Sequence, residues 1–166
     1  KNIHVVKPRK GYSATWWVYA ASTLAMTIPG FKALLLANDE PTAENCLNIT
    51  DAFHNLMHPL AIKPKAVWDK EHRGWLHFRR LREGARKKVE TQGLDSLTMN
   101  DVLEGQASVI VTGSAKTFDM GRSWSPDLAV LTEFGSFGEY GPRLMPSIED
   151  ALGRIGVLVK EGTPKG

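Results

Sequence analysis

Five short runs rich in apolar residues constrain the fold of this chain more than any other feature. They lie at residues 2–7, 31–37, 107–112, 127–134 and 155–160. Most of them do not alternate between apolar and polar residues, which is typical of strands that are buried on both faces. Stretches of helical composition and loops separate them. The sequence therefore predicts an α/β fold with a mostly parallel central sheet flanked by helices on both faces.

The remaining segments are predicted from their turn and cap residues. A helix is expected at residues 14–27, because the composition there is helical and Pro29 and Gly30 end it. A second helix should begin at a Thr42 cap and continue to about Met57. A third helix is expected at 146–154, and a short alternating strand at 74–78. Residues 79–106 are interpreted as a helical or irregular insertion, and residues 113–126 as a polar loop.

Length and composition narrow the class of protein. A chain of 166 residues is long enough for one domain with a sizeable core. Its single cysteine, Cys46, excludes a disulfide framework and a cysteine-based zinc site. No apolar run reaches the length of a membrane-spanning helix, so no membrane partner is expected.

The charge of the chain favours an anionic partner only weakly. The net charge is +3, and basic residues gather between residues 63 and 88. This window is typical either of a solvated helix face or of a track that binds nucleic acid. On charge alone, the solvated face is the better interpretation.

In open parallel sheets, ligands bind outside the carboxyl ends of the strands. Four segments follow predicted strands in this way, namely residues 8–13, 38–41, 133–134 and 162–164. We expect these segments to meet at one edge of the sheet, where they would form the binding site.

The first of these segments has the layout of a phosphate-binding loop. It lies between a strand and a helix, so backbone N–H groups at the helix start would point at an anion. Arg9 and Lys10 add positive charge, and the Ser13 hydroxyl stands where it could bind Mg²⁺. The standard pattern G-x-x-x-x-G-K-[ST] is absent, because Tyr12 occupies the lysine position. A basic turn remains the alternative.

Glu133 and Arg122 are the residue types that hydrolysis of a terminal phosphate requires. A carboxylate orients or deprotonates the attacking water, and a cation stabilises the charge of the transition state. Glu133 ends an apolar run, and Arg122 lies eleven residues before it (133 − 122 = 11). A solvated acid and a surface arginine remain the alternatives.

The order and spacing of these segments resemble the ATPase region of the large terminase subunit, the DNA-packaging motor of tailed double-stranded DNA phages. Residues 7–13 look like the deviant Walker A loop of lambda-like terminases, in which either Lys7 or Arg9 would replace the missing lysine. Residues 34–44 are similar to the second strand of the terminase ATPase region and to the turn that follows that strand. Residues 121–123 resemble the segment with the arginine finger, and residues 157–166 the coupling motif.

The end of the run at 127–134 resembles a Walker B strand, with Thr132 where the family usually carries Asp. The resemblance implies a P-loop NTPase of the additional-strand, catalytic-Glu type that hydrolyses ATP with Mg²⁺. It implies catalytic roles for Glu133 and Arg122, and Mg²⁺ contacts from Ser13 and Thr132. The nucleotide would be held by the first loop, with Thr163 as the sensor of its terminal phosphate. The loop residues concerned are Lys7, Pro8, Arg9, Lys10, Gly11, Tyr12 and Ser13.

The same resemblance implies partners and a place of action. Residues 1–166 would form a single ATPase-like domain that drives double-stranded DNA into a viral procapsid. We expect an adenine-contacting segment before it and a nuclease domain after it, both outside this sequence. The implied partners are double-stranded DNA, the portal protein, the small terminase subunit and further copies in a homo-oligomeric ring. The implied location is the host cytoplasm, at the procapsid portal.

Two other functions are compatible with the sequence. The fold could persist with a degraded loop, as a module that binds DNA or a partner protein without turnover. It could also serve a helicase-like P-loop ATPase outside packaging.

Overall fold

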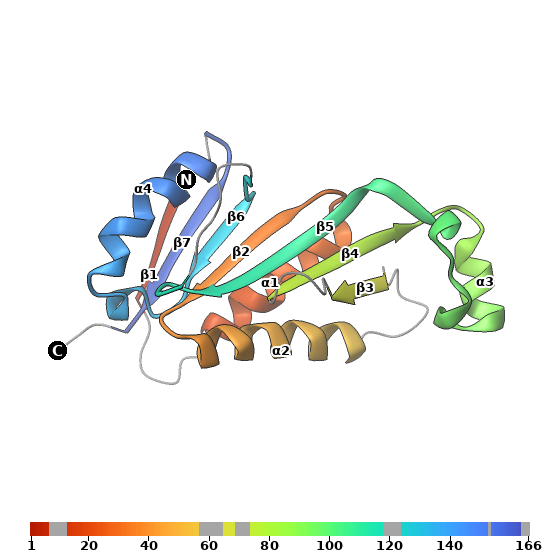
Figure 1. Cartoon of the computed structure of the whole chain (residues 1–166), viewed down its shortest axis with the longest axis horizontal. Helices are drawn as coiled ribbons and strands as arrows, with labels where there is room; N and C mark the ends of the chain where they lie inside the picture. The colour runs from red at the N-terminus through yellow and green to blue at the C-terminus, as the bar shows by residue number, and fades with distance from the viewer. Residues whose placement is uncertain (7–12, 57–64, 69–73, 118–123, 153, 164–166) are drawn as a thin grey trace.

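The structure is a computed structural model of the whole chain (Figure 1). It describes residues 1–6, 13–56, 65–68, 74–117, 124–152 and 154–163; within these, at 13, 65–68, 86, 94, 99 and 104–106, it describes the backbone alone. The helices are α1 (Ser13–Thr27), α2 (Glu40–Leu56), α3 (Ala85–Gln92) and α4 (Tyr140–Leu152). The strands are β1 (Asn2–Val6), β2 (Lys32–Ala37), β3 (Lys65–Trp68), β4 (Trp75–Leu81), β5 (Val102–Ser114), β6 (Leu128–Leu131) and β7 (Val157–Gly162).

The strands of the described chain form one sheet in the order β1-β7-β6-β2-β5-β4-β3. All neighbouring pairs from β1 to β5 are parallel, and only β4 and β3 join antiparallel. The last strand, β7, is inserted between β1 and β6. The predicted fold class is therefore confirmed.

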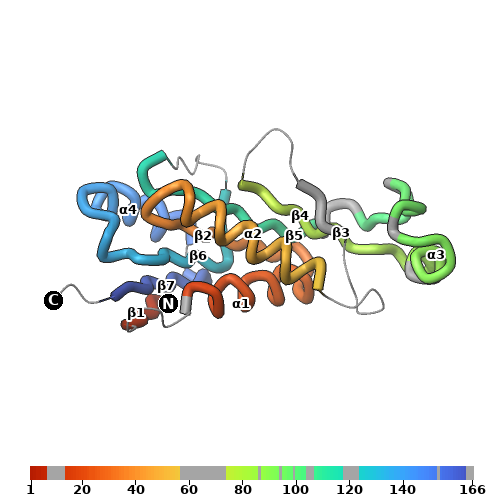
Figure 2. The backbone as a smooth tube through the Cα atoms, turned by 90° about the horizontal axis from the view of Figure 1, so that it is seen from below, coloured from red at the N-terminus to blue at the C-terminus, as the bar shows by residue number. Residues whose placement is uncertain are grey.

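Helices cover the sheet on both faces, as the apolar runs predicted. On one face, Val18 of α1 and Cys46 of α2 pack with Leu35 and Val130 of the sheet. On the other face, α4 packs through Ile148 and Leu152. Figure 2 shows α1 and α2 side by side beneath the strands. Residues 34–37 and 128–131 are buried on both faces, which explains why they are continuously apolar.

The strand β1 is more exposed than predicted. We expected residues 2–7 to be buried, but the side chains of Ile3 and Val6 are 40% and 75% exposed. The reason is the position of β1 at the edge of the sheet, where it pairs with β7 alone.

Two predicted helix starts are wrong. The helix α2 begins at Glu40 and is capped by Asp39, whose Oδ1 accepts the Thr42 backbone N–H over 2.9 Å. Hydrogen bonds from the side chain and the backbone of Thr42 hold the pKa of Asp39 below its usual range. The helix α4 begins at Tyr140, so Pro146 lies inside it and not in its first turn.

The interpretation of residues 79–106 as a helical or irregular insertion is wrong in large part. The strand β4 continues to Leu81 and β5 already begins at Val102, so the two extend as an antiparallel ribbon. A bulge between Phe78 and Arg80 shifts their register. The helix α3 lies at the tip of this ribbon, at the opposite end of the molecule from α4 (Figure 1). We call β4, α3 and the first half of β5 the arm.

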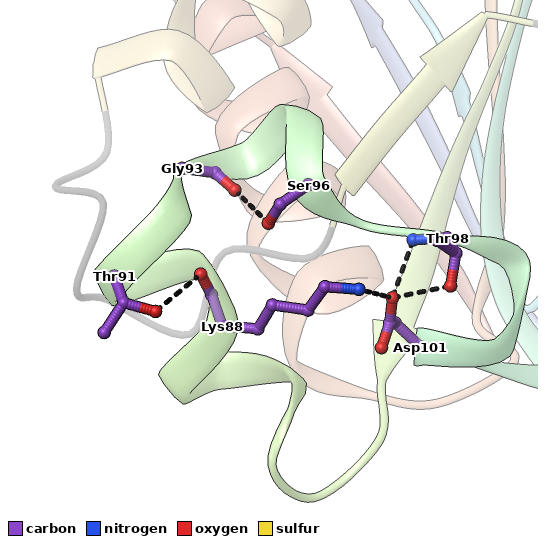
Figure 3. A network of polar contacts seen from close by, with 6 residues as sticks. All are labelled: Lys88, Thr91, Gly93, Ser96, Thr98 and Asp101. Atoms are coloured by element: carbon purple, nitrogen blue, oxygen red, sulfur yellow. Dashed lines mark hydrogen bonds and ion pairs between the residues drawn. The ribbon is translucent and has the colours of Figure 1, made fainter.

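A polar network closes the tip of the arm (Figure 3). Asp101 Oδ2 accepts the Lys88 ammonium over 2.8 Å and both the backbone N–H and the hydroxyl of Thr98 over 2.7 Å. The bonds from Lys88 and then from Thr98 hold the pKa of Asp101 well below its usual range. The charge on Asp101 therefore ties α3 to the start of β5.

Candidate functional site

The parallel register brings the ends of β1, β7 and β6 to one level of the sheet. Val6 pairs with Gly162, and Leu131 pairs with Lys160. Glu133 follows in the turn after β6, and a methyl group on Gly162 would lie 4.0 Å from the Glu133 carbonyl carbon, so Glu133 lies beside the end of β7. Adjacent strands are about 4.8 Å apart, so about 10 Å separates the outer two, with β7 between them.

Glu133 has an unusual backbone conformation. Its φ of 55° and ψ of 40° lie in the left-handed region, which no other non-glycine residue of the described chain occupies. The residue begins the short 3₁₀ helix Phe134–Ser136, and its carbonyl oxygen accepts the Ser136 N–H over 2.7 Å. This conformation costs a residue with a side chain about 1–2 kcal/mol. Strain of this kind gathers at functional sites, so it marks Glu133 as a candidate.

The turn at Glu133 lies directly against the end of β7. A methyl group on Gly162 would lie 3.5 Å from the Gly135 nitrogen and 3.6 Å from the Phe134 nitrogen. A methyl group on Gly135 would lie 4.0 Å from the Thr163 carbonyl oxygen. Two of the predicted site residues, Glu133 and Thr163, are therefore on adjoining segments.

Thr132 is buried inside the sheet. Its side chain is 1% exposed, its backbone N–H donates to the Leu36 carbonyl oxygen over 2.8 Å, and its hydroxyl donates to the same oxygen over 3.3 Å. The hydroxyl group of Thr132 uses its hydrogen in this bond, so the predicted contact with Mg²⁺ would have to use the lone pairs of the Thr132 hydroxyl oxygen.

The ends of β2 and β5 add polar groups that sequence reasoning did not single out. Ala115 donates its N–H to the Ala37 carbonyl, and Lys116 donates its own to the Ser114 hydroxyl over 3.2 Å. The exposed Lys116 lies close enough to Asp39 to lower the pKa of that carboxyl further, after the Thr42 bonds. In the sequence, the position of Lys116 shortly after the predicted strand at 107–112 could have identified it as a residue at this edge of the sheet.

Several predicted site residues fall outside what the structure describes. Ser13 is the first residue of α1, but its side chain is not described. The others lie wholly outside the described residues: Lys7, Pro8, Arg9, Lys10, Gly11, Tyr12 and Arg122. Their roles stay predictions. Among the described side chains, no group of three or more His, Cys, Asp or Glu residues could hold a metal ion.

Solved structures with the same arrangement identify the fold. The "Thermus Phage P74-26 Large Terminase ATPase domain" matches with a TM-score of 0.70 and 16% sequence identity, over 99% of this chain and 60% of that chain. The fold resembles that of large terminase ATPase domains. The "HK97 bacteriophage large terminase" matches with a TM-score of 0.63 and 14% identity, over 97% of this chain and 29% of that chain.

The likeness to the terminase ATPase domains is one of structure. No protein-family model matches the sequence, and no curated protein matches it either. This chain spans less than two thirds of the terminase chains that it matches. The fold is therefore similar to that of the large terminase ATPase domains, and the roles of single residues need separate support. In the part of the chain that is described, no helix is both long and apolar enough to cross a membrane.

Proposed function

We propose that this chain is the ATPase of a viral DNA-packaging motor, which hydrolyses ATP with Mg²⁺ to drive double-stranded DNA into a procapsid. The observation that carries the proposal is the strained Glu133, half-buried at the carboxyl edge of the sheet and beside the end of β7. A ligand between the end of β1 and the start of α1 would lie at the same edge of the sheet as Glu133. The terminase-like fold supports the same function.

The start of α1 would receive the phosphates. A helix N-terminus offers free backbone N–H groups and a favourable dipole to an anion, and the first turn of α1 contains no acidic residue that would repel it. In this proposal Lys7 or Arg9 replaces the lysine of the standard Walker A loop, and Lys10 adds positive charge. The Ser13 hydroxyl binds Mg²⁺.

Glu133 would polarise the attacking water. A carboxylate there has the right chemistry to orient or deprotonate a water in line with the terminal phosphate. Thr163, on the segment adjoining the Glu133 turn, would sense that phosphate. Arg122 would act on the nucleotide of a neighbouring copy in a ring and neutralise the transition-state charge.

Double-stranded DNA is the polymer we propose as cargo, and the arm supplies exposed cations for it. Lys87 on α3 and Arg82 just before it are both exposed. Each phosphate contact that such a residue makes steepens the negative slope of log K against log salt, adding about 0.9 to its magnitude. The portal protein and the small terminase subunit complete the proposed assembly, at the procapsid in the host cytoplasm.

One observation favours a second function. Thr132 replaces the usual Asp and its hydroxyl donates into the sheet, which weakens the support for Mg²⁺. A module that binds DNA or a partner protein without turnover would show this feature.

Two assays separate these functions, both on the longest natural polypeptide that contains this sequence. The first measures Mg²⁺-dependent phosphate release from ATP with and without duplex DNA. The second measures DNA affinity against salt for the wild type, for Lys87→Gln and for Arg143→Gln, an exposed control on α4 at the other end of the molecule. We expect DNA-stimulated turnover and a salt slope that falls by about 1 in Lys87→Gln alone. DNA binding without turnover would favour the binding module.

A further inference from the structure

The turn that carries Glu133 is fixed by a set of contacts around the Phe134 ring. Phe134 follows Glu133 directly, and its ring centroid lies 5.4 Å from that of Phe137. A methyl group on Gly141 of α4 would lie 3.7 Å from the edge of the same ring, an ordinary van der Waals distance. The first turn of α4 therefore lies against the Phe134 ring.

A cation covers this ring from β7. The Lys160 ammonium lies 5.4 Å from the Phe134 ring centroid, within the range of a cation–π interaction. Lys160 is also the register partner of Leu131, the last residue of β6 before the turn. One side chain of β7 therefore contacts the segment that begins at Glu133.

The same ammonium has a second, weaker partner. Glu149 of α4 lies 3.6 Å from it, but the Glu149 side chain is 50% exposed, whereas that of Lys160 is 14% exposed. A long ion pair with a solvated partner contributes little, while a cation over an aromatic face gains strength as it is desolvated. The contact with Phe134 is thus the stronger of the two.

We propose that Lys160 is a positioning residue for Glu133, acting through the Phe134 ring to hold the turn in its left-handed conformation. The strained backbone of Glu133 needs such support, because a residue with a side chain leaves this region when its surroundings permit. The catalytic consequence rests on the proposed function: a carboxylate that drifts by about 1 Å loses rate by as much as about 100-fold. In the proposed function the phosphates bind at the start of α1 and not at this turn, so the affinity for substrate should change little.

The first test follows the turn itself and needs no turnover. It measures the hydrogen-exchange rate of the Ser136 amide, whose N–H donates to the Glu133 carbonyl. The variant Lys160→Met removes the cation and keeps an apolar stem, and Lys160→Arg keeps the cation. We expect Ser136 to exchange about tenfold faster in Lys160→Met and at the wild-type rate in Lys160→Arg and in the matched control Glu149→Gln. An unchanged rate in Lys160→Met would overturn the proposal.

The second test asks whether positioning affects catalysis. We expect Lys160→Met to lower kcat for ATP by about 10- to 100-fold with KM within about twofold, and Lys160→Arg to restore most of kcat. If the wild type turns over and Lys160→Met keeps its kcat, the positioning role is wrong although the proposed function stands. If the wild type does not turn over while Ser136 responds as expected, the proposed function is wrong and the structural support by Lys160 stands.

Discussion

Ser136 donates its backbone N–H to the carbonyl oxygen of Glu133 over 2.7 Å, and this bond closes a turn whose first residue, Glu133, is left-handed. Glycine adopts that conformation without strain. A residue with a side chain at this position therefore lowers the stability of the fold relative to glycine.

The strain at Glu133 predicts the order of stability of two variants. Glu133→Gly should be more stable than Glu133→Ala by about 1–2 kcal/mol, because alanine still pushes its Cβ against the backbone in the left-handed region. Urea unfolding measures the difference. Glu139 is an exposed control outside the left-handed region, where glycine should be no better than alanine. Equal stabilities of the two Glu133 variants would show that the turn relaxes freely.

The ion pair at the tip of the arm predicts a loss of stability in acid. The folded protein holds the pKa of Asp101 well below its usual range, chiefly through the Lys88 bond. An acid with a depressed folded pKa adds stability above the unfolded pKa of about 3.9, and this is lost as the pH falls. Asp101→Asn should therefore lower the urea midpoint at pH 7 and lose less stability than the wild type between pH 5 and pH 3.

The exposed Asp95, on the segment between α3 and β5, is the matched control for this measurement. Asp95→Asn should leave both the midpoint at pH 7 and the acid sensitivity close to those of the wild type. A wild-type midpoint that does not depend on Asp101 at either pH would contradict the account of the arm.

The buried thiol predicts the opposite pH dependence. Burial, and then the charge of Glu161, raise the pKa of Cys46 from its ordinary 9.0 to about 11. A folded pKa above the unfolded value means that this contribution to stability is complete below about pH 9 and is lost as the pH rises towards 11. Cys46→Ala should lessen that alkaline decline. Thiol labelling of Cys46 should be slow in the native protein at pH 8 and fast in urea. Rapid labelling of the native protein would show that α2 separates from the sheet and exposes Cys46.

The sequence predicts the central strands well for a physical reason. Leu34, Leu35 and Leu36 of β2 face both helical layers, so no polar residue interrupts them. The β4–β5 ribbon shows no such signal, because Arg79 and Arg80 break its alternation while the partner strand lies more than twenty residues away. Helix starts failed where a local cap was misread, as at Thr42, which donates to the true cap Asp39.

The candidate site could be predicted in its residue types but not in its geometry. Glu133 was identified as an acid at the end of an apolar run, and the structure adds its left-handed backbone. The insertion of β7 between β1 and β6 depends on pairing between distant residues such as Asn2 and Leu158. The support of the turn by Lys160 and Phe134 follows from that pairing, and no local pattern indicates it.

The most direct test of the central claim compares the wild type with Glu133→Gln in Mg²⁺-dependent phosphate release and in equilibrium ATP binding. The account predicts that Glu133→Gln, which keeps the shape of the side chain and removes its charge, lowers kcat by about 100-fold or more. The dissociation constant for ATP should stay within about threefold, because the phosphates bind at the start of α1. A Glu133→Gln protein that releases phosphate at the wild-type rate would contradict the account.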